Sequence, residues 1–495
     1  MPGGTMADVR EDARVGTGQG VPGTGFPVAT TVRDALYDRI VLSPPELALI
    51  GTRTFLRLDR IQQLGFVSRV WPAAKHTRYE HALGVLHLTR LAVDHLRATA
   101  AGEAITDDDA RVVAAAALLH DIGHYPFSHA IEELGPPVPP HEAVGRRLIT
   151  DPDGELAPIL RDQWGVDPAR VAAVIDPSGG PLPPGDRLLR GLLSGPLDMD
   201  KLDYLPRDAR ACNVPYGGVD TARLIDALTI AEVPLAEGSG GGGDGRGGRS
   251  SADGRGARTS GGADAGFPVP SAPRVVVGAK GVSPLHSLIN ARQEMFDNVY
   301  WHHTNRACMA MLLRAVQEAL LAGAVDPAAL PTHDDASLLA LLADPAMPAP
   351  TRRLTAALAE RRVHKRAVEV SARAVELYGR LGNLYFDPAA RRAAELRLAE
   401  ELEVLTGAPV PLEAVLVDIP KPEKWRTGVW VRFDRPPVGF QTLMPWRDVV
   451  GLGDGDFKRY EEHRRLIRIV AAAPYRDEVA AHWERLVLPL LGGMI

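Results

Sequence analysis

The stretch AALLHDIGHYPFSHA, residues 116–130, is the most informative part of the chain for the fold, and it ends an apolar run with polar side chains. These side chains are His120, Asp121, His124 and His129. Burying such groups is costly unless a partner satisfies them. A divalent cation meets that need, since neutral imidazole and carboxylate are ordinary ligands of first-row metals. The stretch therefore predicts a metal site at the end of a helix.

The remaining ligands must come from segments outside this stretch. Adjacent residues of a helix point about 100° apart, so His120 and Asp121 share an ion only near a helix end, which Gly123 supplies. His81 lies early in a preceding helical segment, 78–98, which a short connection would pack antiparallel. A carboxylate is available in SGPLDMDKLDYLPRDAR, residues 194–210, where several aspartates compete for the role: Asp198, Asp200 and Asp203.

Composition limits the classes of protein to consider. The chain has 495 residues, 45% of them hydrophobic, enough for two or three domains with a real core. Its formal net charge of −6 indicates no general nucleic-acid affinity. Two cysteines, Cys212 and Cys308, exclude a disulfide framework and fit a reducing compartment. With no apolar run near 18 residues and no hydrophobic core in the first 20, we expect a soluble, cytoplasmic protein without a membrane span.

The texture of the chain predicts a mainly α fold: a helical core with a small β-hairpin and a smaller α+β subdomain at the C-terminus. Residues 1–31 are Gly-rich and aperiodic, which predicts a disordered tail. The core domain then covers 32–375. Within it, a low-complexity insertion at 236–270 separates two strand-like segments, which predicts a hairpin with a long loop.

The last part of the chain, 376–495, has a different pattern. Three short segments alternate as strands do, at 411–420, 427–434 and 439–446. A final helix is predicted near 456–471.

Two further segments place chemistry-bearing side chains on one helical face. The first set shares a 3–4-residue spacing and consists of Asp200, Asp203, Tyr204, Arg207 and Asp208. The second set, spaced in the same way, consists of Arg292, Phe296 and Tyr300. Pro206 lies inside the first segment, where it removes a helix hydrogen bond and predicts a kink.

The order H…HD…D is typical of the HD-domain phosphohydrolases, and six blocks resemble their deoxynucleoside triphosphate triphosphohydrolases. The resemblance is closest to the branch of the sterile-alpha-motif HD enzymes and their bacterial relatives. It covers residues 32–315 and continues more weakly to about 370. The blocks, in the family's order, are FLRLDRIQQLG (55–65), HTRYEHALGV (76–85), LLHDIGHYPFSH (118–129), HE (141–142), SGPLDMDKLDYLPRD (194–208) and ARQEMFDNVYWHH (291–303).

The resemblance implies a role for each matching residue. It implies one divalent ion (Mn, Mg, Fe, Ni or Zn) held by His81, His120, Asp121 and Asp200. His124 and His129 match histidines that contact substrate phosphates, Glu132 matches an acidic partner, and His141 matches a general acid. The implied substrate-binding residues are Arg78, Lys201 and Arg292 for phosphate, Tyr204 and Asp208 for the sugar, Gln63 and Leu64 for sugar and base, and Tyr300 beside them.

The implied reaction is attack of a metal-activated water on the α-phosphorus of a deoxynucleoside triphosphate, releasing deoxynucleoside and triphosphate. The family also implies a homo-oligomer. Two alternatives stay open: another phosphoester substrate (a nucleoside monophosphate, a cyclic nucleotide or a nucleic-acid end), or a non-catalytic nucleotide sensor.

The sequence departs from the family at its nucleotide-activator pocket. Gly51, Leu56 and Asp59 stand where the family has Asp, Gln and Arg, and none offers the same hydrogen bonds to guanine. Activation by dGTP is therefore not expected. Arg361 and Lys365 do resemble the family's basic pair, which leaves an anion contact between subunits open.

Overall fold

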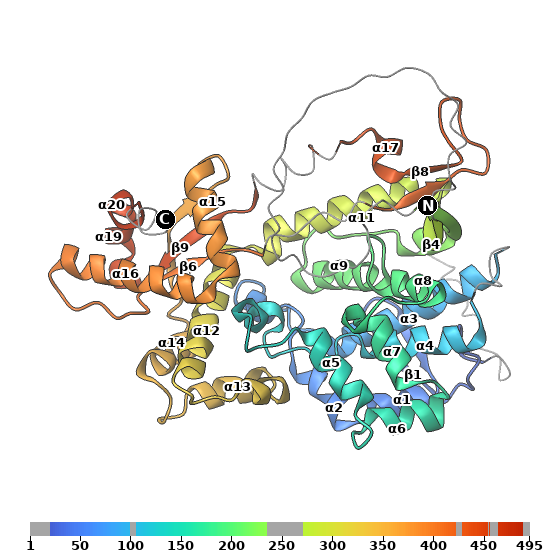
Figure 1. The fold of residues 1–495 in the computed structure, drawn as a ribbon, viewed down its shortest axis with the longest axis horizontal. Helices are drawn as coiled ribbons and strands as arrows, with labels where there is room; N and C mark the ends of the chain where they lie inside the picture. The colour runs from blue at the N-terminus through green and yellow to red at the C-terminus, as the bar shows by residue number, and fades with distance from the viewer. Residues whose placement is uncertain are drawn as a thin grey trace, which may run out of the picture.

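The computed structural model describes residues 20–99, 105–234, 271–421, 428–453, 455 and 464–488. The predicted insertion at 236–270 lies outside these residues. Helices dominate the described chain and the strands form three small sheets (Figure 1). The predicted fold class, mainly α with small β elements, is confirmed.

The core of the molecule is a layered set of helices around one large hydrophobic cluster. Two long helices lie at its centre, α3 (Arg78–Arg97) and α4 (Asp107–Leu119), and both begin with a capping box. The surrounding helices are α1 (Pro44–Ile50), α2 (Arg53–Leu56), α5 (His141–Thr150), α6 (Leu156–Ile159), α7 (Pro168–Ile175), α8 (Pro184–Leu193), α9 (Met199–Cys212), α10 (Thr221–Asp226) and α11 (Val282–Met295). The apolar run before His120 forms the buried face of α4, as its composition predicts.

The chain then continues through helices around a second apolar cluster, which surrounds α12. These are α12 (His303–Leu321), α13 (Asp335–Leu342) and α14 (Ala349–Ala359). The C-terminal lobe has its own core and holds α15 (Val375–Asn383), α16 (Pro388–Thr406), α19 (Arg476–Ala481) and α20 (Trp483–Val487).

The three sheets join segments that are distant in sequence. An antiparallel hairpin forms from β1 (Thr30–Asp34) and β2 (Asp38–Leu42). A four-stranded sheet has the order β3 (Leu228–Pro234), β4 (Ser271–Gly278), β7 (Trp430–Arg432) and β8 (Leu443–Pro445), with β4 and β7 parallel. A three-stranded antiparallel sheet has the order β5 (Lys365–Val370), β9 (Ile467–Ala471) and β6 (Val415–Asp418).

The predicted domain boundary at 375/376 does not describe this arrangement. Strands β7 and β8 and helix α17 (Trp446–Val450) lie on the core domain, where Val431 and Trp446 join the main hydrophobic cluster (Figure 1). Conversely, β5 lies before the boundary and pairs with β9 of the C-terminal lobe. The two parts exchange strands because pairing across the sheets is decided by tertiary contacts, which a linear composition change does not report.

Two local predictions are wrong. The predicted tail extends to residue 31, yet Val21 is buried, the Phe26 ring packs edge-on against Trp164 at 5.6 Å, and β1 begins at Thr30. Residues 1–19 lie outside the described part. A helix is predicted near 456–471, but its last residues, Ile467–Ala471, form strand β9 instead. This strand is wholly buried between β5 and β6. Residues 456–463 are not described. Helix α9 continues through Pro206, so the proline does not end the helix.

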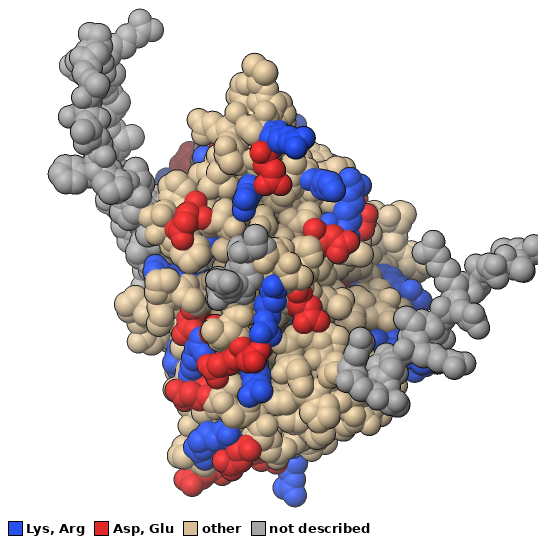
Figure 2. Space-filling view, turned by 90° about the vertical axis from the view of Figure 1, so that its right-hand side faces the viewer, with Lys and Arg blue, Asp and Glu red and all other residues tan. Residues whose placement is uncertain are grey.

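Acidic and basic residues are nearly equal in number in the sequence, 62 and 56. On the face drawn in Figure 2, acidic and basic side chains are interspersed. Within the described residues, no helix is both long enough and apolar enough to cross a bilayer.

Candidate metal centre and substrate site

Three helices bring the four predicted metal ligands together. His81 comes from the first turn of α3, His120 and Asp121 end α4, and Asp200 lies in the first turn of α9. Ligand atoms of His81, His120 and Asp121 all lie within 4.8 Å of one another. The Asp200 carboxylate lies 3.0 Å from His81 Nε2 and 3.9 Å from His120 Nε2. We call these four residues the metal corner.

The imidazoles of the metal corner are oriented as metal ligands are. His120 Nδ1 donates to the carbonyl of Ala117 at 2.8 Å, which leaves the Nε2 lone pair facing the corner. That buried Nε2 has no hydrogen-bond partner among the described residues. Burial lowers the pKa of His81, but hydrogen bonds to Asp200 and Asp203 outweigh it and raise it to about 10. The corner thus attracts positive charge, and its donor set fits one divalent first-row ion.

Asp203 supports the metal corner from behind. Its carboxylate accepts from His81 Nδ1 at 2.8 Å, from the Tyr37 hydroxyl at 2.7 Å and from Arg207 Nε at 2.9 Å. The sequence pattern predicts Asp203 as a competing ligand, whereas the structure places it at Nδ1 of His81, on the side of the ring away from the metal corner. Gly84 permits this approach, because a Cβ there would lie 1.9 Å from Asp203 Oδ1. A glycine one turn after His81 in an apolar helix was the signal for this packing.

A second group of imidazoles lies beside Asp121. We call His124, His129 and His141 the histidine cluster; their ligand atoms also lie within 4.8 Å of one another. His124 and His141 stack with ring centroids 3.8 Å apart. His124 Nε2 lies 3.3 Å from Asp121 Oδ1, which joins the cluster to the metal corner.

Glu132 controls the charge of the histidine cluster. Its carboxylate contacts His141 Nδ1 at 2.6 Å and His129 Nδ1 at 3.0 Å. Burial lowers the pKa of His141, but the Glu132 charge and hydrogen bond outweigh it and raise it to about 9. Burial and the Arg78 charge hold the pKa of His124 well below its ordinary value. One ring of the stacked pair is therefore protonated at neutral pH and the other is not.

A glycine is needed at position 123 for a reason other than the predicted one, which was to end the helix. It does not adopt a positive φ, and His120 caps α4 in an ordinary right-handed conformation. A Cβ at Gly123 would instead lie 2.1 Å from the carbonyl oxygen of His141 and 2.4 Å from the Gly145 nitrogen. Its hydrogen lets α5 approach closely, and this brings His141 against His124.

The predicted phosphate-binding cations have protein partners. Arg78 is buried and forms an ion pair with Asp121, and its Nε lies 3.2 Å from the Ser128 hydroxyl. Lys201 Nζ lies 2.6 Å from Asp198 and 3.0 Å from the Gly195 carbonyl. Arg292, on α11 against α9, stacks over Phe296 at 4.6 Å.

The predicted sugar-binding residues lie together on α9 and the turn after α11. Asp208 is buried and accepts from the Tyr300 hydroxyl at 2.7 Å; its other oxygen lies 2.7 Å from His76 Nε2. The Tyr204 ring lies 6.4 Å from His81 and 6.5 Å from Tyr300. His76 has no predicted role, because its partner Asp208 is 132 residues away in sequence.

Gln63 and Leu64 follow the isolated bridge between Gln62 and Thr77. The Gln63 Oε1 atom is buried without a hydrogen-bond partner in the described chain. Leu64 is half-buried and packs on the main core. Of these two residues, Gln63 is therefore the one with a polar side-chain atom that could meet a substrate.

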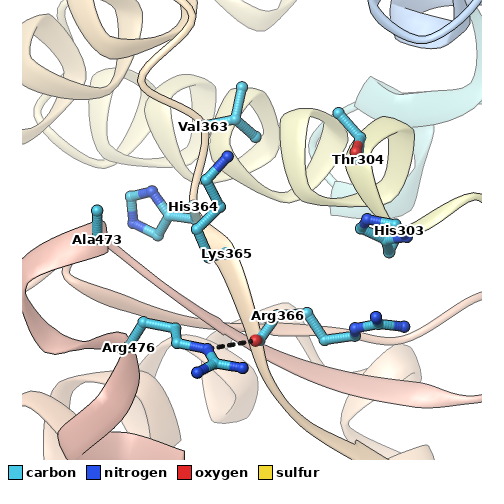
Figure 3. Close-up of a pocket in the computed structure, with 8 residues that line it drawn as sticks. All are labelled: His303, Thr304, Val363, His364, Lys365, Arg366, Ala473 and Arg476. Carbon is cyan, nitrogen blue, oxygen red and sulfur yellow. Dashed lines mark hydrogen bonds between the residues drawn. The ribbon is translucent and has the colours of Figure 1, made fainter.

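A separate cationic pocket of about 360 Å³ lies between α12, β5 and α19 (Figure 3). Lys365 and Arg366 come from β5, His303 and Thr304 from α12, and Arg476 donates through Nε to the Arg366 carbonyl at 3.1 Å. The predicted basic pair is divided: Lys365 lines the pocket, whereas Arg361 donates to the Arg69 carbonyl at 2.9 Å. In the altered activator positions, Leu56 is exposed and Asp59 contacts Thr77 at 3.5 Å.

Comparisons with known proteins show which families and proteins this chain resembles. A family model described as HD domain matches residues 78–173, and one described as HD associated region matches 271–432. An uncharacterized protein of Methanocaldococcus jannaschii is 28% identical over 63% of this chain and 54% of that protein. Human deoxynucleoside triphosphate triphosphohydrolase SAMHD1 is 28% identical over 41% of this chain and 36% of that protein. The chain spans about half the length of the first curated relatives it matches.

A solved structure extends the comparison beyond the matched segments. The crystal structure of a phosphohydrolase from Bacteroides thetaiotaomicron superposes with a TM-score of 0.61, at 19% identity, covering 90% of this chain and all of that one. At this identity the likeness shows the fold alone. The two family models show that this chain contains an HD domain followed by an HD-associated region.

Proposed function

We propose that this chain hydrolyses deoxynucleoside triphosphates to deoxynucleoside and triphosphate, using one divalent ion at the metal corner. The observation that carries the proposal is the juxtaposition of two imidazole sets across Asp121. One set presents Nε2 atoms to a cation, and the other holds a protonated His141 against a neutral His124. A Lewis acid next to a general acid is what cleavage of a phosphoester requires.

In the proposed reaction, the metal corner activates the water and His141 supplies the proton for the leaving group. An ion in the metal corner would lower the pKa of a bound water and polarise a phosphoryl oxygen. A water oxygen attacks the α-phosphorus and gives up a proton to solvent, while the bond from that phosphorus to the 5′-oxygen breaks. His141 gives its proton to the departing 5′-oxygen, an effect of about 10²–10⁴-fold in rate. Glu132 keeps His141 protonated until that moment.

Two observations support a nucleotide as the substrate. Tyr204 lies beside His81, and the Asp208–Tyr300 pair lies beside Tyr204, where a sugar bound next to the phosphates would meet hydrogen-bonding groups. Arg78 and Lys201 bring positive charge to the ligands Asp121 and Asp200, and a triphosphate carries three to four negative charges. Human SAMHD1, named a deoxynucleoside triphosphate triphosphohydrolase, is 28% identical over 41% of this chain.

Product analysis tests the proposal. The purified chain is incubated with each of the four dNTPs and Mn²⁺ or Mg²⁺, and products are separated by ion-exchange chromatography and ³¹P NMR. We expect deoxynucleoside and inorganic triphosphate in equal amounts. Release of a nucleoside monophosphate or diphosphate would contradict the triphosphohydrolase proposal, and the same assay on cyclic nucleotides and nucleic-acid ends would then identify the phosphoester.

The sensor alternative makes a different prediction. A nucleotide-dependent rise in the melting temperature without any turnover, at full metal occupancy, would favour it. We expect turnover, because a sensor has no use for a proton held on His141.

A further inference from the structure

The loop that carries the histidine cluster has an unusual backbone. Phe127 (φ 56°) and Ser128 (φ 60°) are consecutive non-glycine residues in the left-handed region. Side chains with a Cβ seldom occupy this region, and such residues persist only where surrounding contacts hold them. Both lie between His124 and His129, so their conformation sets where those two imidazoles point.

One buried carboxylate from a distant helix holds this backbone. Asp335 Oδ1 accepts from the Phe127 N–H at 2.7 Å, and its Oδ2 accepts from the Gln62 N–H at 3.0 Å. These residues are 208 and 273 positions away in sequence. Gln62 directly precedes Gln63 and Leu64, the residues expected to contact sugar and base.

Asp335 is not needed to begin its own helix. The first turn of α13 is capped by Asp334, whose carboxylate accepts from the Ser337 N–H at 2.8 Å. The Asp335 side chain is free of that task and is buried between the two segments.

Neighbouring contacts reinforce the same connection. The Ser128 hydroxyl lies 3.1 Å from the carbonyls of both Gln62 and Gln63. Arg57 donates to the His124 carbonyl at 2.8 Å and to the His333 carbonyl, just before α13, at 3.0 Å. The start of α13 therefore joins the phosphate side of the site to the nucleoside side.

Keeping a carboxylate at this position is not favourable for stability alone. Burial raises the pKa of Asp335 to about 6, despite the two amide donors and the charge of Arg78. The ionised form is thus disfavoured by folding, although it is the form that offers acceptors to both amides at neutral pH.

We propose that Asp335 is a positioning residue, whose carboxylate sets the distance between the nucleoside-binding segment 62–64 and the phosphate-binding histidines 124 and 129. The proposal rests on the proposed function for its substrate. Asp335 itself touches neither substrate nor metal; it acts through Gln62 and Phe127.

The test uses the full chain with Asp335→Asn, which keeps the shape but replaces one acceptor oxygen with a donor. One of the two amides then loses its partner. We expect kcat/KM for dNTP to fall roughly 10- to 100-fold. Metal content stays that of the wild type, the melting temperature changes by a few degrees at most, and hydrogen exchange accelerates in peptides covering 62–64 and 122–129.

The matched control is Asp334→Asn, the same change one residue earlier, where asparagine still caps the helix. We expect its kcat/KM to stay within about twofold of wild type. Equal losses in the two variants, or a melting temperature that falls in step with activity in Asp335→Asn, would show a purely structural role and overturn the proposal. Unchanged exchange in both segments would overturn it as well.

Two further measurements keep the proposal falsifiable. If the wild type binds dNTP without turnover, the proposed function fails, and the ratio of dissociation constants for Asp335→Asn and wild type replaces kcat/KM. If Asp335→Asn does not fold, the wild type itself is measured, since protonation of Asp335 near pH 6 removes one acceptor. The charged groups facing this carboxyl are Arg57, Arg78 and Asp334. Protection of the two segments that is unchanged from pH 7.5 to pH 5 would then overturn it.

Discussion

The metal corner and the histidine cluster share Asp121 but use imidazole in opposite ways. In the metal corner, Nδ1 of each imidazole is bound to protein oxygen, at Ala117 or Asp203, and Nε2 is directed to a shared point. In the histidine cluster, the acidic partner of Nδ1 keeps a proton on His141. His81 and His141 both have a carboxylate behind Nδ1, so the groups on the other side of each ring distinguish them: the Asp200 carboxylate lies 3.0 Å from His81 Nε2, whereas the His124 ring stacks on His141.

Removing one ligand of the metal corner should have the largest effect, because it should abolish metal binding while the histidine cluster stays in place. Replacing His120 or Asp121 with Ala leaves the other ligands incomplete, so we expect loss of bound metal and activity below about 1% of wild type. Elemental analysis and the dNTP product assay measure both. The exposed His482 provides a control in His482→Ala, and retained metal stoichiometry in His120→Ala would refute the ligand assignment.

Removing the acid should separate the two sides. His141→Gln cannot carry the proton but leaves the metal corner unchanged, so we expect kcat to fall about 10²–10⁴-fold at wild-type metal content. Steady-state kinetics with elemental analysis checks this. A variant that keeps wild-type kcat would assign the proton to another group.

Weakening the support behind a ligand should have an intermediate effect. In Asp203→Asn the amide cannot accept from His81, Tyr37 and Arg207 together, so His81 loses its orientation and basicity. We expect metal affinity to fall about 10–100-fold, measured by competition with a chelator, with activity restored at saturating metal. Loss of activity that excess metal does not restore would place Asp203 in another role.

The smallest expected effect is a shift in the pH dependence of kcat when the carboxylates beside His141 are changed. Glu132 raises the pKa of His141 to about 9, so wild-type kcat should hold below that pH and fall as the proton is lost above it. Glu132→Gln removes the charge, burial then lowers the pKa, and the fall should begin at lower pH. Glu142→Gln, at a more exposed carboxylate 3.4 Å from the same nitrogen, should move the profile less. Identical profiles in all three proteins would contradict the assignment of the acid.

Local patterns predicted the elements that hold the site. The helix expected at 78–98 is Arg78–Arg97, and the strand-like segments flanking the insertion pair as an antiparallel hairpin. Periodicity and capping residues act within a few residues, so they can be read directly. The exchange of β5 and β7 between the two parts could not, because short strands choose partners through tertiary packing.

Sequence patterns also identify candidate metal ligands more readily than the residues that hold those ligands in position. Residue type and the family resemblance proposed the ligands, and the structure places the candidates His81, His120, Asp121 and Asp200 close to one another. Three contacts that shape the site join segments far apart in the chain. They are the hydrogen bond from His81 to Asp203, the close approach of α5 to Gly123, and the hydrogen bond from Phe127 to Asp335. A sequence pattern carries no distance between such segments.

By itself, the sequence indicated which side chains are candidates for metal and acid–base chemistry, because its histidines and aspartates are clustered and follow the order of a known family. Only the tertiary structure decided which imidazole would be neutral and which protonated. That choice depends on the carboxylate or carbonyl behind each ring and on burial, and both arise when α3, α4, α5 and α9 pack together.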